Sequence, residues 1–595
     1  MKKGIIRGLA IIGALYVLIP LVLIGYGFIA KRIKSQIADN TILELNLEQE
    51  IIEYVPPSIS QLMESKKMTV LGIVRALERA SEDDRVYGLV AKVGESELGM
   101  AQIQEIRDAV IRFRSAGKKA VAWAETMGEF GPGNKSYYLA SAFDEIYLQP
   151  SGELGLTGLI FESPFVKETL KKLDLEPQLG HRYEYKNAPN TFTHTSFTKP
   201  HREALEAIMN SMFGQLVGGI SESRGIEQDS LKRLIDEGPY LSTGALEAGL
   251  IDGLAYRDEV YEKVREEAGD GAKFLFLNKY FDRVGPSGDA ENTFALIYGN
   301  GMIKRGKSGY DMVFGSTTMG SETVSAAFRA AIKDEGISAI VFRIDSPGGS
   351  AVASDTIWRE TVRAKEAGKP VFVSMGNVAG SGGYWVAMDA TGIVAQPGTI
   401  TGSIGVFGGK FYTSGLWNRL GVSWDEIHTS KNSTIWSSTT KYNAAEWAKI
   451  DLLLDDIYDE FTAKVARGRG LEKSRVHKIA KGRVWTGEDA HKLGLVDELG
   501  GIMMAIDLAK EATGIGKDEP VKLKIFPREK TLIEVLFAAL LGEEDESSEP
   551  GTALGVIGSV ADSLRPFRDL YQVLGLRDQE GPLLMPSHFY TGSIK

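Results

Sequence analysis

The chain has 595 residues, of which 43% are hydrophobic and 25% charged, and its net charge is −11. These are the values of a globular protein with room for two or three domains, and they exclude a basic surface for nucleic acid. Cysteine is absent, which excludes disulfides, thiolate nucleophiles and cysteine metal sites. Any chemistry must therefore come from serine, lysine, histidine and carboxylates.

The first predicted element is a membrane anchor within residues 1–39. Gly8 to Ala30 carries no charge and has Lys or Arg on both flanks. A helix of this length would measure about 34 Å, which spans a hydrocarbon core of about 30 Å. No cleavage site follows the apolar stretch, so an uncleaved single-pass anchor is favoured over a removed signal peptide. The flanking charges weakly favour an inner-membrane protein with its body on the periplasmic side.

After the anchor, apolar runs alternate with helical patterns. Strands are expected at 41–47, 87–93 and 119–123, with a helix at about 101–114. The pattern returns with strands at 294–298, 339–344 and 371–374 and a helix at 351–366. Continuous apolar strands separated by helices indicate an α/β fold around a buried, mainly parallel sheet.

The second half of the sequence repeats the first. Aligning Tyr137 with Tyr384 also aligns Ile146 with Ile393, Gln149 with Gln396 and Pro150 with Pro397, and Asp252 later matches Asp497. The alignment predicts two tandem units, 40–283 and 293–517, joined by a polar linker. Residues 518–595 have no partner in the other half and form a tail with an acidic linker at 542–551. Its apolar patches, 532–541 and 583–585, are expected to pack on the body, with a docking helix or a membrane-surface contact as alternatives.

Ser381 is the candidate nucleophile. It lies in the run VSMGNVAGSGGYW, Val373 to Trp385, and aligns with Asn134 of the first unit, which cannot be deprotonated for attack. The flanking glycines allow a tight turn, as in a nucleophile elbow, and a helix starting near Gly382 would add the positive end of its dipole. A serine between glycines is more often only a turn. The asymmetry between the units favours one working site per chain.

The run DSPGGS, Asp345 to Ser350, is the candidate oxyanion hole. Gly348 and Gly349 can point successive amide hydrogens into one cleft, which is what a developing oxyanion requires. The alternative is a plain glycine-rich turn between strand and helix. The first unit reads GESELG at this place and has lost the paired glycines together with the serine. The loss of both features in the first unit favours an active site over a plain turn.

The general base is less obvious from the sequence. None of the seven histidines lies in a recognisable motif: His181, His194, His201, His428, His477, His491 and His588. Lysine can act as a base only when burial lowers its pKa from about 10.4. Lys186, in the run RYEYKNAPN with few cations nearby, is the candidate.

These motifs, with TGSIG at Thr401 to Gly405 and the YK segment at Tyr185, resemble signal peptide peptidase A in its long, duplicated form. The resemblance implies tandem Clp protease/crotonase-like domains and a Ser/Lys dyad, with Ser381 as nucleophile and Lys186 as base. It assigns Ser403 to assist the lysine, and it assigns the oxyanion hole to Gly348, Gly349 and Gly382. It implies cleavage of remnant signal peptides and other short apolar peptides by a homotetramer, with no cofactor, metal or nucleic acid.

Two departures from the family pattern and two rival functions stay open. Asn187 follows the base lysine and Gly380 precedes the serine, where the family has serine and alanine. The second unit also keeps a lysine, Lys431, which is expected to be vestigial or a surface residue. The rivals are an acyl-CoA enzyme on the same body and a non-catalytic membrane scaffold, which CoA binding or acylation of Ser381 would discriminate.

Overall fold

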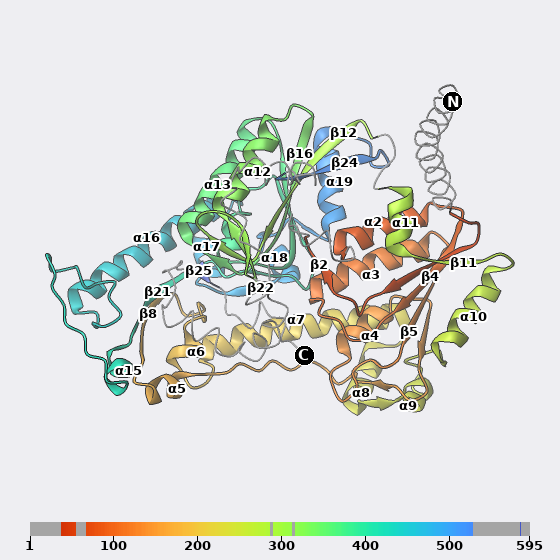
Figure 1. Cartoon of the computed structure of the whole chain (residues 1–595), viewed down its shortest axis with the longest axis horizontal. Helices are drawn as coiled ribbons and strands as arrows, with labels where there is room; N and C mark the ends of the chain where they lie inside the picture. The colour runs from red at the N-terminus through yellow and green to blue at the C-terminus, as the bar shows by residue number, and fades with distance from the viewer. Residues whose placement is uncertain (1–36, 55–66, 286–289, 312–315, 528–582, 585–595) are drawn as a thin grey trace, which may run out of the picture.

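The computed structural model describes residues 37–54, 67–285, 290–311, 316–527 and 583–584. The predicted anchor at 8–30, the acidic linker at 542–551 and the apolar patch at 532–541 lie outside these residues. Among the helices that are described, none has the length and hydropathy of a membrane crossing. The described chain forms two units, each built around a mainly parallel sheet, as Figure 1 shows on its right-hand side and at its top.

The first unit has a six-stranded parallel sheet in the order β10-β6-β5-β4-β1-β11. Its strands are β1 (Thr41–Asn46), β4 (Val86–Lys92), β5 (Lys119–Ala124), β6 (Glu145–Leu148), β10 (Gly253–Leu254) and β11 (Lys273–Phe276). Short pairs form from β2 (Ile51–Ile52) with β3 (Met68–Thr69) and from β7 (Glu153–Leu154) with β9 (Tyr240–Leu241). The helices are α2 (Val70–Ser81), α3 (Met100–Ser115), α4 (Asn134–Ala140), α5 (Lys167–Lys172), α6 (Asn190–Thr193), α7 (Lys199–Arg224), α8 (Gln228–Glu237), α9 (Ser242–Glu247), α10 (Arg257–Ala268) and α11 (Leu277–Val284).

The second unit contains the sheet β22-β20-β18-β16-β12-β24, with β19 also pairing with β18 and β23 with β19. These strands are β12 (Asn292–Asn300), β16 (Ile337–Ser346), β18 (Val371–Gly380), β19 (Gly392–Ala395), β20 (Ile400–Gly402), β22 (Val484–Thr486), β23 (Glu498–Leu499) and β24 (Val521–Phe526). The helices are α12 (Ser321–Lys333), α13 (Ala351–Glu366), α14 (Gly382–Trp385), α15 (Ser414–Arg419), α16 (Ala444–Gly468), α17 (Lys473–Ile479), α18 (Gly487–Leu493) and α19 (Ile502–Thr513).

The structure repeats itself as the sequence alignment predicts. The order β23-β19-β18-β16-β12-β24 corresponds strand for strand to β10-β6-β5-β4-β1-β11. Equivalent hydrogen bonds recur as well, because the Tyr137 and Tyr384 hydroxyls each donate to a leucine carbonyl, Leu250 O and Leu495 O. One boundary needs correction: β24 pairs with β12, as β11 does with β1, so the second sheet continues past the predicted limit at residue 517.

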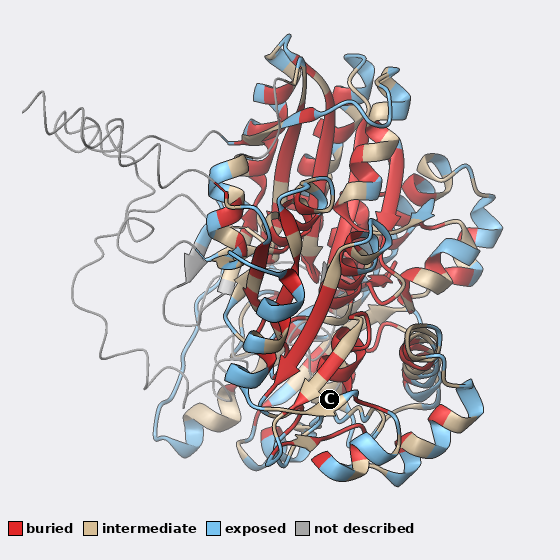
Figure 2. Ribbon diagram, turned by 90° about the vertical axis from the view of Figure 1, so that its right-hand side faces the viewer, coloured by how far each residue is buried: buried red, intermediate tan, exposed pale blue. Residues whose placement is uncertain are grey.

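The core strands are buried on both faces because helices cover each side of the sheet. Figure 2 shows the buried strands running through the centre of the molecule. In β16 only two of ten positions are even partly exposed, which agrees with its apolar sequence. Helix α13 begins where predicted, because the Ser350 side chain accepts a hydrogen bond from Ala353 N and caps it.

Two further pairings position the site. Strand β8 (Glu176–Arg182) of the first unit pairs antiparallel with β21 (Val406–Tyr412) of the second. A separate sheet has the order β14-β15-β13-β17-β25, formed by β13 (Met302–Lys304), β14 (Gly309–Asp311), β15 (Ser316–Gly320), β17 (Gly348–Gly349) and β25 (Leu583–Leu584). Chain segments far apart in sequence therefore meet beside the end of β18, while α7 runs across the base of the molecule in Figure 1.

Candidate active site

Ser381 follows β18 directly and is completely buried. Its amide donates to Gly402 O at 2.8 Å, and its backbone has φ 55° and ψ −116°. The glycines on either side were expected to make the turn, but none of the three has a positive φ. The uncommon conformation therefore belongs to the serine itself, as in a strained nucleophile turn.

The helix after Ser381 begins where the sequence predicted. Residues Gly382–Trp385 form α14, and helical hydrogen bonds continue beyond it, since Val386 N donates to Gly382 O and Met388 N donates to Tyr384 O. β18 extends to Gly380, six residues beyond the predicted strand end at Ser374, and carries the serine to the start of this helix.

Lys186 reaches the same place from the first unit. The turn after β8 is held by Lys481 O, which accepts from the amides of Tyr183 and Tyr185. Gly482 then passes so close that a Cβ on it would lie 2.5 Å from Lys186 Cβ. Lys481 and Gly482 of the second unit thus hold the backbone of the segment that carries Lys186. The sequence analysis did not identify these two residues, because contacts made through the backbone leave no sequence motif.

The Lys186 amino group is surrounded by three oxygen atoms. Nζ lies 2.9 Å from Ser381 Oγ, 3.0 Å from Ser403 O and 3.1 Å from Ser403 Oγ. The side chain is 1% exposed, and burial lowers the pKa of Lys186 to about 7. A neutral amine has two donors and one lone pair, so it can donate to Ser403 and accept from the Ser381 hydroxyl.

Ser403 is fixed by its backbone. Its amide donates to Arg483 O at 2.7 Å, and its φ is 53°. Strand β20, immediately before it, pairs with β18 so that Gly402 lies opposite Gly380. The TGSIG segment is therefore in register with the serine turn, and the Ser403 hydroxyl points at the lysine that it was predicted to assist.

Gly348 and Gly349 form β17, next to the serine turn. Their φ values are 102° and 154°, and a Cβ on Gly349 would lie 2.1 Å from Ile303 O, so only glycine fits there. A Cβ on Gly382 would lie 3.2 Å from both Gly348 Cα and Gly349 N. The amide of Gly348 makes a 3.2 Å hydrogen bond to Ser346 Oγ. The three glycines predicted as an oxyanion hole are thus close neighbours.

The equivalent place in the first unit has no such arrangement. The Asn134 side chain is buried, where Oδ1 accepts from the amides of Thr157 and Gly158 and Nδ2 donates to Gly158 O. Lys431 is exposed, in agreement with the surface interpretation. Asn187, the departure after the base, accepts a hydrogen bond from Asn190 Nδ2 at 3.2 Å.

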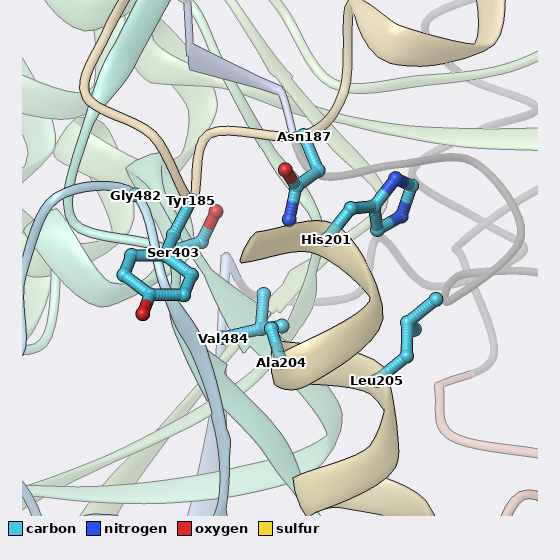
Figure 3. A pocket seen from close by; sticks show the side chains of 8 residues that line it. All are labelled: Tyr185, Asn187, His201, Ala204, Leu205, Ser403, Gly482 and Val484. Carbon is cyan, nitrogen blue, oxygen red and sulfur yellow. The ribbon is translucent and has the colours of Figure 1, made fainter. Parts of the chain in front are cut away.

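A small cavity of about 10 Å³ adjoins the dyad, with room for about one water molecule. Figure 3 shows the residues that line it, which come from the turn after β8, from α7 and from the segments around Ser403 and Val484: Tyr185, Asn187, His201, Ala204, Leu205, Ser403, Gly482 and Val484. His201 Nδ1 lies 3.4 Å from Asn190 Nδ2. Within the described residues, no histidine makes a recorded hydrogen bond to Ser381 or Lys186, and His588 lies outside them.

Comparison with known proteins agrees with this geometry. The sequence profile of Peptidase family S49 matches twice, at residues 112–270 and 363–516. The chain belongs to peptidase family S49. The duplicated profile confirms the resemblance to the long signal peptide peptidase A form and identifies a serine protease.

Three relatives show how far the similarity extends. "Serine protease SPPA, chloroplastic" of Arabidopsis thaliana is 30% identical over 473 residues, 78% of this chain and 68% of that protein. "Protease 4" of Haemophilus influenzae is 31% identical over 477 residues, 77% of this chain and 75% of that protein. A protein of Enterococcus faecium, named as a candidate signal peptide peptidase SppA, is 31% identical over 179 residues, 30% of this chain and 52% of its own.

Proposed function

We propose that this S49 peptidase hydrolyses peptides with a Ser381/Lys186 dyad. Ser381 Oγ attacks the peptide carbonyl carbon while neutral Lys186 takes the hydroxyl proton and passes it to the leaving amine. Water then hydrolyses the acyl-enzyme by the same proton relay. The observation that carries the proposal is the 2.9 Å separation of Lys186 Nζ and Ser381 Oγ in a buried site.

The neighbouring groups have supporting roles. Gly348, Gly349 and Gly382, which are close neighbours beside Ser381, supply the amides that stabilise the oxyanion. The Gly348 amide must leave Ser346 Oγ to take part. Ser403, with two oxygens within 3.1 Å of Nζ, orients the lysine so that its lone pair faces Ser381. The parallel sheets with glycine-rich strand ends support a Clp protease/crotonase-type body for each unit.

The proposed substrates are remnant signal peptides and other short apolar peptides. The name of the Enterococcus faecium relative supports this substrate class.

We also propose that the protein is a homotetramer held in the inner membrane by residues 8–30, with its body on the periplasmic side. The uncharged run supports the anchor. Assembly is supported by large apolar side chains that are exposed around α15, α16 and the segment between them: Leu420, Val422, Trp424, Ile427, Trp436, Leu452 and Leu453. Exposed apolar surface of this kind marks interaction sites.

The test is hydrolysis of a quenched fluorogenic apolar peptide by purified variants. Ser381→Ala and Lys186→Ala are expected to abolish turnover, whereas Lys431→Ala, the matched exposed lysine of the second unit, should leave it unchanged. Ser403→Ala should lower kcat about ten- to hundredfold, because a hydrogen bond to a charged or charge-bearing group contributes about 1.5–3 kcal/mol. A serine-directed fluorophosphonate should label Ser381. Turnover retained by folded Lys186→Ala would overturn the dyad, and saturable CoA binding would favour the acyl-CoA alternative.

A further inference from the structure

The turn at residues 481–483, between α17 and β22, is bonded to both groups that adjoin the nucleophile on the lysine side. Lys481 O accepts from the amides of the two tyrosines that precede Lys186, and Arg483 O accepts from the amide of Ser403. Lys481 itself has φ 56°, in the left-handed region that few residues with a Cβ adopt, so contacts outside the turn must hold it there. A displacement of this turn would move Lys186 and Ser403 together.

Tyr458, on α16, supplies such a contact. Lys481 N donates to the Tyr458 hydroxyl oxygen at 3.3 Å. The Tyr458 ring also packs edge-on against the ring of Tyr183, with the two centroids 4.8 Å apart. Tyr458 is only 3% exposed. This one buried side chain therefore contacts the segment of the base in two ways, through the Lys481 amide and through an aromatic ring.

His477, on α17, completes the bonding of the Tyr458 hydroxyl. A backbone amide can only donate, so the oxygen accepts from Lys481 N and the hydroxyl hydrogen is free for another acceptor. His477 Nδ1 lies 3.2 Å from that oxygen, and the His477 ring packs edge-on against the rings of Tyr183 and Tyr458. Burial raises the pKa of Tyr458, which keeps the hydrogen on the hydroxyl. His477 Nδ1 is thus the acceptor, with the ring proton on Nε2.

The helix that carries Tyr458 also supports the strand leading to the base. Asp451, Asp455 and Tyr458 follow one another at helical spacings of four and three residues, so they share one face of α16. Both carboxylates accept hydrogen bonds from Arg182, the last residue of β8. Figure 1 shows α16 beside α17 and above β8 and β21. One face of a 25-residue helix therefore holds β8 and the turn that follows it.

We propose that Tyr458 is a positioning residue of the hydrolytic reaction, which holds Lys481 so that Lys186 meets Ser381, and that His477 orients its hydroxyl. This inference rests on the proposed function. Within the part of the chain that the structure describes, neither side chain has a recorded hydrogen bond to Lys186 or Ser381, so both act through the backbone turn. A misplacement of about 1 Å caused far from the reacting atoms can lower a rate about a hundredfold.

The same turn keeps water away from the amine. A Cβ on Gly482 would lie 2.5 Å from Lys186 Cβ, so the turn covers the lysine whose pKa is lowered by burial. A loosened turn would admit water and return the pKa of Lys186 toward its ordinary value. A positioning role at Tyr458 therefore predicts a shift in the pH dependence of catalysis, which a loss of stability alone would not produce.

The experiment compares Tyr458→Phe with a matched control, Tyr280→Phe. Tyr458→Phe keeps the ring and removes only the hydroxyl group. It is expected to lower kcat for the fluorogenic peptide about tenfold or more on the alkaline plateau, at unchanged KM. The midpoint of its kcat/KM profile should move upward by about half a pH unit or more. Tyr280 is equally buried and donates through its hydroxyl to Asp83 of the first unit, so Tyr280→Phe should leave kcat and the profile unchanged.

Two variants of His477 test the acceptor of the hydroxyl group. His477→Asn can place an amide oxygen where Nδ1 lies, whereas His477→Leu removes the acceptor, and both lose the aromatic ring. The asparagine variant should keep most of the natural kcat, and the leucine variant should behave as Tyr458→Phe does. Equal activities of these two variants would overturn the role assigned to His477.

A second readout separates this proposal from the proposed function. Hydrogen exchange at the amides of Tyr183 and Tyr185 is measured in Ser381→Ala protein, without any turnover, and adding Tyr458→Phe should accelerate it. Unchanged kcat and pH profile in Tyr458→Phe would overturn the positioning role even if fluorophosphonate labels Ser381 normally. A lower kcat with an unshifted midpoint and unchanged exchange would overturn it as well, in favour of a general loss of structure. Turnover retained by folded Lys186→Ala would instead overturn the dyad, and the exchange rates would still decide whether Tyr458 holds the segment.

Discussion

Arg343 Nη2, in the second unit, donates a 2.8 Å hydrogen bond to Glu105 Oε2 of the first unit, and both side chains are buried. The same guanidinium group binds Glu53 of the first unit with two hydrogen bonds and donates to Ser374 Oγ on β18. Glu105 Oε1 accepts from Ile502 N at 2.7 Å. This ion cluster joins the two units close to β16 and β18, the strands that lead to the oxyanion glycines and to the nucleophile.

Arg343→Met should therefore destabilise the whole protein. The substitution leaves the carboxylates of Glu53 and Glu105 buried without their cation, a change that costs about 3–5 kcal/mol. The double variant Arg343→Met/Glu105→Leu should lose less than the sum of the single losses, because each change removes the other's unpaired charge. Urea denaturation followed by circular dichroism measures these free energies of unfolding.

The control for this cluster is the exposed pair of Lys232 and Asp229 on α8. Lys232→Met should leave the urea midpoint unchanged, since solvent-exposed ion pairs contribute little. A loss below about 1 kcal/mol for Arg343→Met would contradict the role given to the cluster in joining the units.

The pH dependence of catalysis should report Lys186. Burial lowers the pKa of Lys186 to about 7, and only the neutral amine can accept the Ser381 proton. The value of kcat/KM should rise about tenfold per pH unit below that pKa and level off above it. Lys186→Arg should be inactive across the range, because guanidinium does not lose its proton. An active arginine variant would be incompatible with proton abstraction at this position.

The same group should couple stability to pH. In the unfolded chain Lys186 has a pKa of about 10.4, so between about pH 7 and pH 10.4 the unfolded state binds a proton that the folded state lacks. The free energy of unfolding must then increase with pH across that window. Subtracting the values measured for Lys186→Met isolates this contribution. A difference that stays flat over the window would mean that the lysine is charged in the folded protein.

The backbone of Ser381 predicts a stability difference between two inactive variants. A residue with a Cβ at φ 55° and ψ −116° is strained by about 1–3 kcal/mol, and glycine is not. Ser381→Gly should therefore be more stable than Ser381→Ala by about 1 kcal/mol or more, as measured by thermal denaturation. Equal stabilities would show that the turn carries no strain at this position.

The helices and strands around the site could be predicted from the sequence more readily than the contacts between them. Strands such as β16 and helix α13 follow from apolar runs and a serine cap, and the duplication follows from matched residues. The approach of Lys186 to Ser381 across 195 positions depends on the pairing of β8 with β21. β8 reads EPQLGHR and has little apolar alternation, so no periodicity predicts that pairing. The run RYEYKNAPN made Lys186 a candidate base, and the family resemblance then assigned it that role.

The segment assigned to the tail and the turn at Ser381 show two other limits of prediction from the sequence. β24 lies in a segment that was assigned to the tail because it lacks sequence identity with the first unit, yet it occupies the place of β11 in the repeated sheet. An edge strand accepts many different residues, so the sequence identity between the two units is lost there before it is lost in the central strands. At Ser381 the glycines suggested where the chain turns, but steric contacts in the folded protein decide which residue takes the positive φ.

Asp345, in the DSPGGS run, helps to position the end of the strand that carries Ser381, and substitutions at Asp345 can test this role. It is the last residue of β16 that pairs with β12, and its Oδ1 accepts from Val378 N at 2.9 Å, three residues before the nucleophile. Burial, and then the nearby Glu53 carboxylate, raise the pKa of Asp345 to about 7. Asp345→Asn keeps the acceptor and removes the charge, so it should be at least as stable as the natural protein at pH 8. Asp345→Ala leaves the Val378 amide unpaired and should lose about 1–3 kcal/mol.

The sign of the pH effect distinguishes the two roles of Asp345. Between about pH 4 and pH 7 the folded protein holds a proton on this carboxyl group that the unfolded chain releases, so rising pH lowers the free energy of unfolding across that window. The advantage of Asp345→Asn over the natural protein should therefore grow from pH 4 to pH 7 and then stay constant. If the advantage were independent of pH, Asp345 would be charged in the folded state throughout, and its contact with Val378 alone would account for its place beside the nucleophile.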